Sequence, residues 1–255
     1  MNESTNRLYE LYMQSSKHSN YQILAESVQG LLDTSKLEIT SRNEKERLRY
    51  ILRHVNFLDT TVMDIGGNTG YFTFEVLDRG AKHVYYCEGN RNHAEFVKEA
   101  VKLLKCEKDI TIDNSYYEFG EIQDKPFYDI TFCLNVIHHL GDDFGKTNDK
   151  LSALDEMKRC INSMASVTDT LVFQMGYNWK GDRKQCLFEN GTKAEMIDFI
   201  RKSTEGVWQI QNIGVAVVRD DRVDYEDINE ENIKRIDSYG EFLNRPIFIM
   251  KSCNH

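Results

Sequence analysis

The fold of this chain is decided by the stretch 62–72, which reads VMDIGGNTGYF. Residues 61–65 are short and mostly apolar or β-branched, as a buried parallel strand should be. Residues 66–70 supply the backbone freedom that a tight turn needs. Apolar residues then recur at roughly helical spacing over 71–77. The stretch therefore predicts a strand, a turn and a helix whose free N–H groups point at whatever binds in the turn.

Two nucleotide-binding motifs compete for this turn. A dinucleotide fingerprint needs glycines spaced G-x-G-x-x-G, and Gly66, Gly67 and Gly70 cannot be threaded onto that spacing without losing one. The chain matches D-x-G-x-N-x-G instead, with Asp64 first and with Asn68 able to adopt the same positive φ as a glycine. A glycine turn that binds no ligand is the alternative interpretation.

With this second motif the chain resembles the class I methyltransferases that use S-adenosylmethionine. In that family the loop wraps the amino-acid end of the cofactor. The resemblance implies that Gly66 and Gly70 allow close approach of the cofactor, and that Asp64 anchors either the loop or the cofactor's ammonium group; Gly67 and Asn68 are cofactor-binding candidates of the same loop. S-adenosylmethionine is therefore the expected cofactor.

The ends of three later strands carry further candidate cofactor residues. Glu88 lies about 20 residues after the loop, where a carboxylate can accept the ribose hydroxyls, although a solvated charge is the alternative. By resemblance, Asp113 or Asn114 meets the adenine amino group, and Asp113 is preferred. Asn135 ends the fourth strand, at the expected boundary between cofactor and acceptor.

Strands and helices alternate along the rest of the chain, which predicts an α/β fold. We expect a doubly wound, mostly parallel, seven-stranded sheet of the Rossmann-like methyltransferase type, with helices on both faces. The predicted helices are 41–58, 70–79, 91–104, 147–164 and 192–203, and the predicted strands are 61–65, 83–88, 109–114, 127–135, 168–175, 207–218 and 245–251.

The chain is expected to form a single structural domain with two additions. Residues 1–58 form an N-terminal helical extension, and 59–255 form the cofactor-binding domain. The acidic insert 219–244 precedes the last strand and should lie over the ligand face as a lid, unless it is only a solvated loop. Residues 17–22 either close over the cofactor or link two helices.

Composition narrows the expected partners. The 41 acids outnumber the 32 bases, for a net charge of −9, which argues against a broad footprint for nucleic acid or anionic lipid. No stretch approaches a membrane span or the apolar core of a signal peptide. Six cysteines without a CxxC pair suggest reduced thiols in a cytoplasmic protein and argue against zinc. The sequence does not indicate an oligomeric state.

The part of the site that binds the methyl acceptor is expected after the fourth strand. His139, or else His138, is the candidate base, since histidine accepts a proton near neutral pH; either ring could instead only pack or hydrogen-bond. A divalent metal is not expected; if one binds, His138, His139, Asp142 or Asp143 would hold it, together with an acid from the insert.

The candidate substrate contacts lie at and just beyond the end of the fifth strand; they are Gln174, Tyr177, Asn178 and Trp179. Their amide and aromatic groups suit a polar, ring-shaped acceptor, although Tyr177 and Trp179 could simply cover the sheet edge. We therefore expect methyl transfer to a hydroxyl of a small acceptor, a sugar or nucleotide-activated sugar for surface polysaccharide, by loose resemblance to methyltransferases of that setting. The alternatives are a tRNA or other small-molecule N/O-methyltransferase and a non-catalytic S-adenosylmethionine-binding protein.

Overall fold

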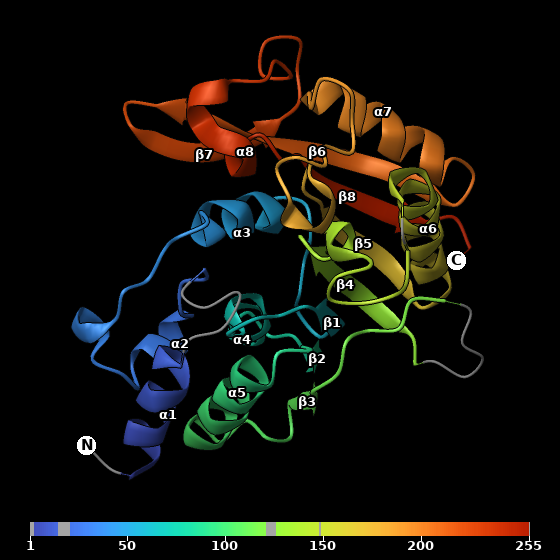
Figure 1. The fold of residues 1–255 in the computed structure, drawn as a ribbon. Coiled ribbons are helices and arrows are strands. Elements are labelled where there is room, and N and C mark those ends of the chain that lie inside the picture. The colour runs from blue at the N-terminus through green and yellow to red at the C-terminus, as the bar shows by residue number, and fades with distance from the viewer. Residues whose placement is uncertain (1–2, 15–20, 121–125, 148, 255) are drawn as a thin grey trace. The chain divides into compact units, whose positions relative to one another are not determined.

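A computed structural model describes residues 3–14, 21–120, 126–147 and 149–254 (Figure 1). The chain forms two compact units. The first comprises Met1–Glu44 and Asn56–Tyr117, and the second comprises Lys45–Val55 and Glu118–His255. Each unit has its own strands and helices.

The first unit is built on three parallel strands in the order β3-β2-β1. Their bounds are Thr61–Ile65 for β1, His83–Cys87 for β2 and Ile110–Asp113 for β3. The register pairs Ile65 with Cys87, and Cys87 with Asp113. The carboxyl ends of all three strands therefore meet at one edge.

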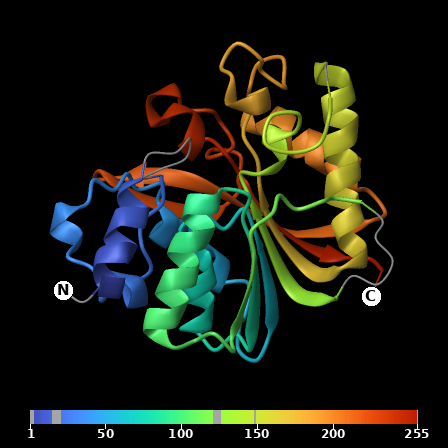
Figure 2. The same cartoon turned by 60° about the horizontal axis from the view of Figure 1, so that its bottom comes forward.

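The first unit also contains helices before and between these strands. They are α1 (Glu3–Met13), α2 (Glu26–Gln29), the short 3₁₀ helix η1 (Thr34–Lys36), α4 (Tyr71–Leu77) and α5 (Arg91–Leu104). Helix α5 begins where the Asn90 side chain accepts hydrogen bonds from two backbone N–H groups of its first turn. Figure 2 shows α1 beside α5, and Tyr12 meets Phe96 there with ring centroids 5.7 Å apart. Packing, rather than strand pairing, thus attaches the N-terminal helix to this unit.

The second unit contains five strands in the order β4-β5-β8-β6-β7. Strands β4 and β5 are parallel, and β8, β6 and β7 are added antiparallel. The strands are β4 (Tyr128–Leu134), β5 (Thr168–Gln174), β6 (Trp208–Arg219), β7 (Arg222–Asp227) and β8 (Ile247–Ser252). The helices are α3 (Glu44–Leu52), α6 (Lys150–Ser163), α7 (Lys193–Thr204) and α8 (Gly240–Leu243), with 3₁₀ helices η2 (Ile137–His139), η3 (Met164–Ser166), η4 (Trp179–Gly181) and η5 (Asp237–Tyr239).

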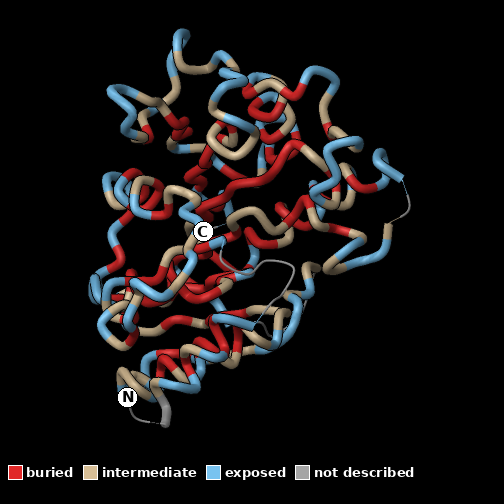
Figure 3. Tube along the Cα trace, turned by 60° about the vertical axis from the view of Figure 1, so that its left-hand side comes forward, coloured by how far each residue is buried: buried red, intermediate tan, exposed pale blue. Residues whose placement is uncertain are grey.

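Buried residues follow the strands in both units (Figure 3). Strand β1 is buried from its second residue onward, and β4 and β5 are buried over most of their length. This pattern is that of strands covered on both faces, and it explains why their sequences read as nearly continuous apolar runs.

The predicted α/β class with a parallel-dominated sheet is confirmed, with one difference. The described residues form eight strands rather than seven. The extra strand, β7, lies inside the acidic insert and pairs with β6. Asp220 and Asp221 connect the two strands with positive φ values of 50° and 59°, as in a type I′ hairpin turn. The insert is thus partly an edge strand.

Other sequence-based expectations are met in part. The predicted helix 41–58 is shorter and is observed as Glu44–Leu52. The proposed domain boundaries and the lid role of the insert stay predictions. In the part of the chain that the structure describes, no helix combines the length and the apolar character needed to cross a membrane.

Helix α3 is held in the second unit by Tyr50. Its ring lies against Gly214 of β6, where an added Cβ would come within 2.3 Å of the ring, and its hydroxyl donates a 2.7 Å hydrogen bond to Asp227. Tyr50 is fully buried. Glycine at position 214 is therefore a steric requirement for this packing.

We expect Gly214→Ala to destabilise the protein by about 1–3 kcal/mol, because the new methyl group displaces the Tyr50 ring. Urea unfolding measures the effect. Gly30→Ala is the control, since Gly30 has a helical φ of −62° and its nearest neighbour would lie at 3.4 Å. Equal stability of the two variants would contradict the packing argument.

Candidate functional site

The turn after β1 has the strained backbone that its sequence predicts. Gly66, Asn68 and Gly70 all have positive φ, at 68°, 52° and 79°. A Cβ on Gly67 would lie 2.6 Å from the Tyr86 ring. The expectation that Asn68 takes a glycine-like conformation is confirmed, and the loop tolerates no side chain at position 67.

Asp64 is buried beneath this turn. Its Oδ2 accepts a 2.7 Å hydrogen bond from the Thr73 hydroxyl, which belongs to α4. Burial raises the pKa of Asp64 to about 6, Thr73 opposes that rise, and the charge of Glu88 adds to it. Because the carboxylate joins β1 to α4, the arrangement fits the loop-anchoring role rather than direct binding of an ammonium group.

Glu88 holds the other side of the turn. Its carboxylate accepts hydrogen bonds from the backbone N–H groups of Asn68, at 2.9 Å, and Asn90, at 2.7 Å. The Asn114 amide donates to the Glu88 carbonyl at 2.8 Å, and Asp113 accepts from the Tyr85 hydroxyl at 2.6 Å. The structure therefore gathers the predicted cofactor residues of the first unit at the carboxyl ends of its strands.

Gln22 also belongs to this cluster, although no sequence motif marks it. Its side-chain oxygen accepts hydrogen bonds from the Thr69 hydroxyl at 3.1 Å and from the Tyr71 N–H at 3.0 Å. Tyr71 begins α4, so Gln22 satisfies a free N–H group at that helix end. The prediction for 17–22 concerns this segment, but 17–20 lie outside the described residues.

In the second unit, Asn135 and Gln174 contact a half-buried arginine, Arg245. Asn135, with a φ of 64°, donates to the Gln174 side chain at 3.0 Å and accepts from Arg245 at 2.7 Å. Gln174 is fully buried and donates to the Arg245 carbonyl at 3.0 Å. Arg245 also forms an ion pair with Glu241. The sequence did not single out Arg245 or Glu241, because isolated charges before a strand carry no motif.

The side chains of the remaining predicted substrate residues make contacts within the protein. Tyr177 is buried and donates to the Asn244 carbonyl at 2.6 Å, and Trp179 is buried and donates to the Leu140 carbonyl at 2.7 Å. Asn178 is half-buried in a bridge to Cys186. These contacts show the two aromatic side chains packed and hydrogen-bonded within the protein; their substrate role, and the alternative that they cover the sheet edge, stay predictions.

The two adjacent histidines lie in different surroundings. His138 is buried, with its ring against Gly176, whereas the His139 side chain is 17% exposed. Their ring centroids are 4.3 Å apart. His139 is the more accessible of the two candidate bases, which matches the weak preference drawn from the sequence; the base role itself stays a prediction.

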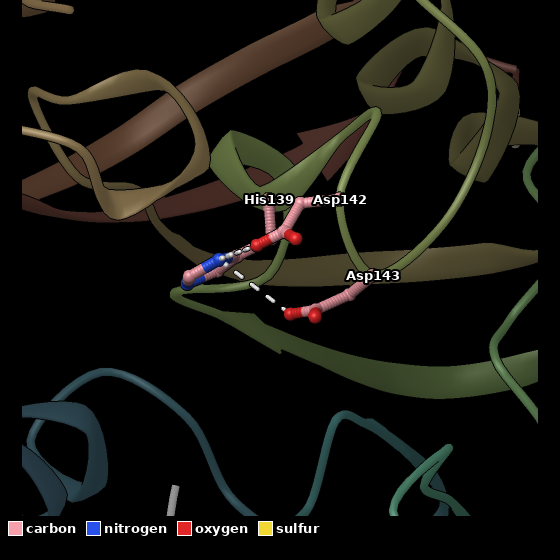
Figure 4. Close-up of side chains that lie close together, drawn as sticks. All are labelled: His139, Asp142 and Asp143. Atoms are coloured by element: carbon pink, nitrogen blue, oxygen red, sulfur yellow. Dashed lines mark ion pairs between the residues drawn. The ribbon is translucent and has the colours of Figure 1, made fainter. Parts of the chain in front are cut away.

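His139 faces two carboxylates (Figure 4). Its Nδ1 lies 3.5 Å from an oxygen of Asp143 and 4.0 Å from an oxygen of Asp142. One ligand atom from each of the three residues lies within 4.8 Å of the others. Of the four metal ligands considered from the sequence, these three come together in the described structure, and His138 is not part of the group.

Comparisons with known proteins give a likeness in fold and a likeness in sequence over part of the chain. No protein-family model matches the sequence. The chain is 30% identical over 141 residues to a tRNA U34 carboxymethyltransferase of Campylobacter hominis, covering 53% of this chain and 42% of that protein. It is 27% identical over 129 residues to the Nautilia profundicola tRNA U34 carboxymethyltransferase, covering 48% and 37%. The chain thus spans less than half the length of the curated relatives it matches.

One solved structure supports the fold. The bifunctional kinase-methyltransferase WbdD matches with a TM-score of 0.55 and 14% identity, over 97% of this chain and 46% of that one. At this identity the likeness shows a shared fold alone. The chain is similar in sequence to tRNA-modifying transferases and similar in fold to a methyltransferase.

These relatives correct one expectation. We expected a sugar acceptor and no nucleic-acid partner, and this is wrong, because the matching relatives act on tRNA by name. The net charge of −9 is a sum over the whole chain and does not report on a local binding surface. Moreover, the aromatic residues assigned to a sugar are buried.

The buried Asp64 carboxyl should make stability depend on pH. Unfolded, it loses its proton near pH 3.8, and folded near pH 6, so stability is lost as the pH rises through that window. Between pH 3 and pH 7, we expect the free energy of unfolding of the wild type to fall by about 3 kcal/mol relative to that of Asp64→Asn. Urea unfolding across this range measures the difference, and parallel curves would contradict it.

Proposed function

We propose that this chain is an S-adenosylmethionine-dependent transferase that modifies an RNA of the tRNA class. The observation that carries the proposal is the cluster at the carboxyl ends of β1, β2 and β3, where a left-handed turn, a carboxylate and an amide meet. The names of the curated relatives support the acceptor class.

The cluster offers a partner for each part of the cofactor. The turn 66–70 allows close backbone approach to the amino-acid end, because Gly66 and Gly70 carry no side chain. The half-exposed Glu88 carboxylate can accept the two ribose hydroxyls in addition to its backbone donors. Asp113 and Asn114 lie at the end of the neighbouring strand, at the distance of one strand spacing, and suit the adenine edge.

A basic loop in the second unit suits an RNA backbone. It carries Lys180, Arg183 and Lys184, and Arg183 and Lys184 are exposed. The loop is held by hydrogen bonds from Trp179 to Gln185 and to Leu140, the residue after His139. Cations on a structured loop bind phosphates without first having to be ordered. The loop therefore places positive charge close to the predicted acceptor residues of the same unit.

We propose methyl as the transferred group, rather than the carboxymethyl group in the relatives' name. A carboxymethyl donor carries an additional carboxylate, which needs a cation when it is buried. The Arg245 guanidinium already forms an ion pair with Glu241 and donates a hydrogen bond to the Asn135 side chain. Its charge is thus matched within the protein.

The cofactor assignment is tested by calorimetry with S-adenosylmethionine and by transfer of a labelled methyl group to bulk tRNA. We expect binding at one site, and we expect Glu88→Ala to weaken it about tenfold or more, because two ribose hydrogen bonds to a charged group are lost. Glu95→Ala, at a half-exposed position on α5 where the side chain pairs with Lys98, should bind as the wild type does. Cofactor binding without transfer to any RNA would favour a non-catalytic binding protein.

The basic loop is tested by RNA affinity as a function of salt. Arg183→Ala with Lys184→Ala should weaken tRNA binding about tenfold at low salt and reduce the slope of log K against log salt by about 1.5, because two phosphate contacts are lost. The matched control is Lys158→Ala with Arg159→Ala, which removes two exposed cations from α6. An equal effect of the two pairs would refute a specific role for the loop.

A further inference from the structure

The loop that follows η2 brings together three side chains with metal-binding atoms. His139 offers an imidazole nitrogen, and Asp142 and Asp143 offer carboxylate oxygens. We propose that this loop binds one divalent cation through these three residues. The inference concerns binding alone and does not depend on the transfer reaction.

The backbone of the loop fixes the three positions. The His139 carbonyl accepts hydrogen bonds from the Asp142 N–H at 3.0 Å and the Asp143 N–H at 3.1 Å. Gly141 closes the turn with a φ of 82° and donates to the Phe144 carbonyl at 2.6 Å. A Cβ at Gly141 would lie 3.0 Å from the Thr147 carbonyl, so the turn requires glycine. Binding would therefore need side-chain rotation but little backbone change.

The distances suit a single ion. Metal–ligand bonds of about 2.0–2.2 Å place neighbouring ligand atoms roughly 3–3.5 Å apart. The His139 Nδ1 already lies 3.5 Å from Asp143 and 4.0 Å from Asp142, and the three ligand atoms all lie within 4.8 Å of one another, so side-chain rotations would bring them to this spacing. Asp142 is the most exposed of the three, with 36% of its side chain accessible.

Charge also favours a dication. Two carboxylates approach one imidazole, so within this group of three side chains the negative charges outnumber the positive one even when the ring is protonated. A divalent ion balances both, and it accepts the imidazole as a neutral ligand. The mixed nitrogen and oxygen set suits Mn²⁺, Fe²⁺ or Zn²⁺ better than Mg²⁺ or Ca²⁺, which prefer oxygen ligands alone.

Three protein ligands leave coordination positions for other groups. The partial exposure of Asp142 and Asp143 lets water or an anionic oxygen, such as a phosphate oxygen, complete the shell. Metal binding at Nδ1 would keep the His139 proton on Nε2, so this ring could not also be the base predicted from the sequence. The two roles of His139 exclude each other.

The test is titration of the metal-free full chain with Mn²⁺, followed by calorimetry and electron paramagnetic resonance. We expect one equivalent to bind, a nitrogen coupling from an imidazole ligand in the resonance spectrum, and a rise in melting temperature with Mn²⁺ concentration. His139→Ala should remove the nitrogen coupling, and Asp143→Asn should weaken binding at least tenfold.

Two controls keep the result interpretable. His138→Ala, the adjacent ring outside the cluster, should retain the nitrogen coupling, and Asp182→Asn, an exposed acid of the same unit, should retain the affinity. Circular dichroism of each variant without metal establishes that it is folded. The proposal is overturned if the wild type binds no Mn²⁺, or if Asp143→Asn binds as the wild type does. Because neither donor nor RNA is present, failure here leaves the proposed transferase activity standing, and the reverse also holds.

Discussion

The parallel register of β1, β2 and β3 is the constraint on which the cofactor assignment depends. Parallel strands bring their carboxyl ends to one edge, and the pairing of Ile65 with Cys87 and of Cys87 with Asp113 places a turn, an acid and an amide there. A shift of one residue in either pairing would turn each side chain to the opposite face and disperse the cluster. The site of the first unit is thus a product of register as much as of residue type.

The sequence predicts the strands well where burial dominates their composition. The ends of β1, β2 and β5 lie within one residue of those expected, because runs of apolar and β-branched residues leave little ambiguity. Strand β7 was not predicted, because its sequence, RVDYED, is acidic and resembles that of a loop. It forms because β6 supplies a free edge and Tyr225 is buried. Tertiary pairing overrides local propensity there.

The candidate site divides in the same way. Asp64, Gly66 and Glu88 are recognisable because a short motif fixes their spacing. Arg245 is not, because it acts through partners distant in the sequence, as its bond to Asn135 illustrates. Gln22 was expected only as part of the segment 17–22, since its own contact with Tyr71 is also distant in the sequence. The prediction of the acceptor class was wrong for a related reason. A cofactor motif carries no information about the acceptor. The net charge is a sum over the whole chain, so it does not report the charge of the few loop residues that would contact the acceptor.

The turn 66–70 is held by hydrogen bonds within the protein. Glu88 accepts one from the Asn68 N–H, and Gln22 accepts one from the Thr69 hydroxyl. The shape of the turn is therefore set during folding rather than on ligand binding. A donor and its demethylated product share the amino-acid, ribose and adenine groups and would meet the same rigid surface. If the proposed donor binds there, the spent product should compete strongly with fresh donor, and turnover should be sensitive to how quickly that product is removed.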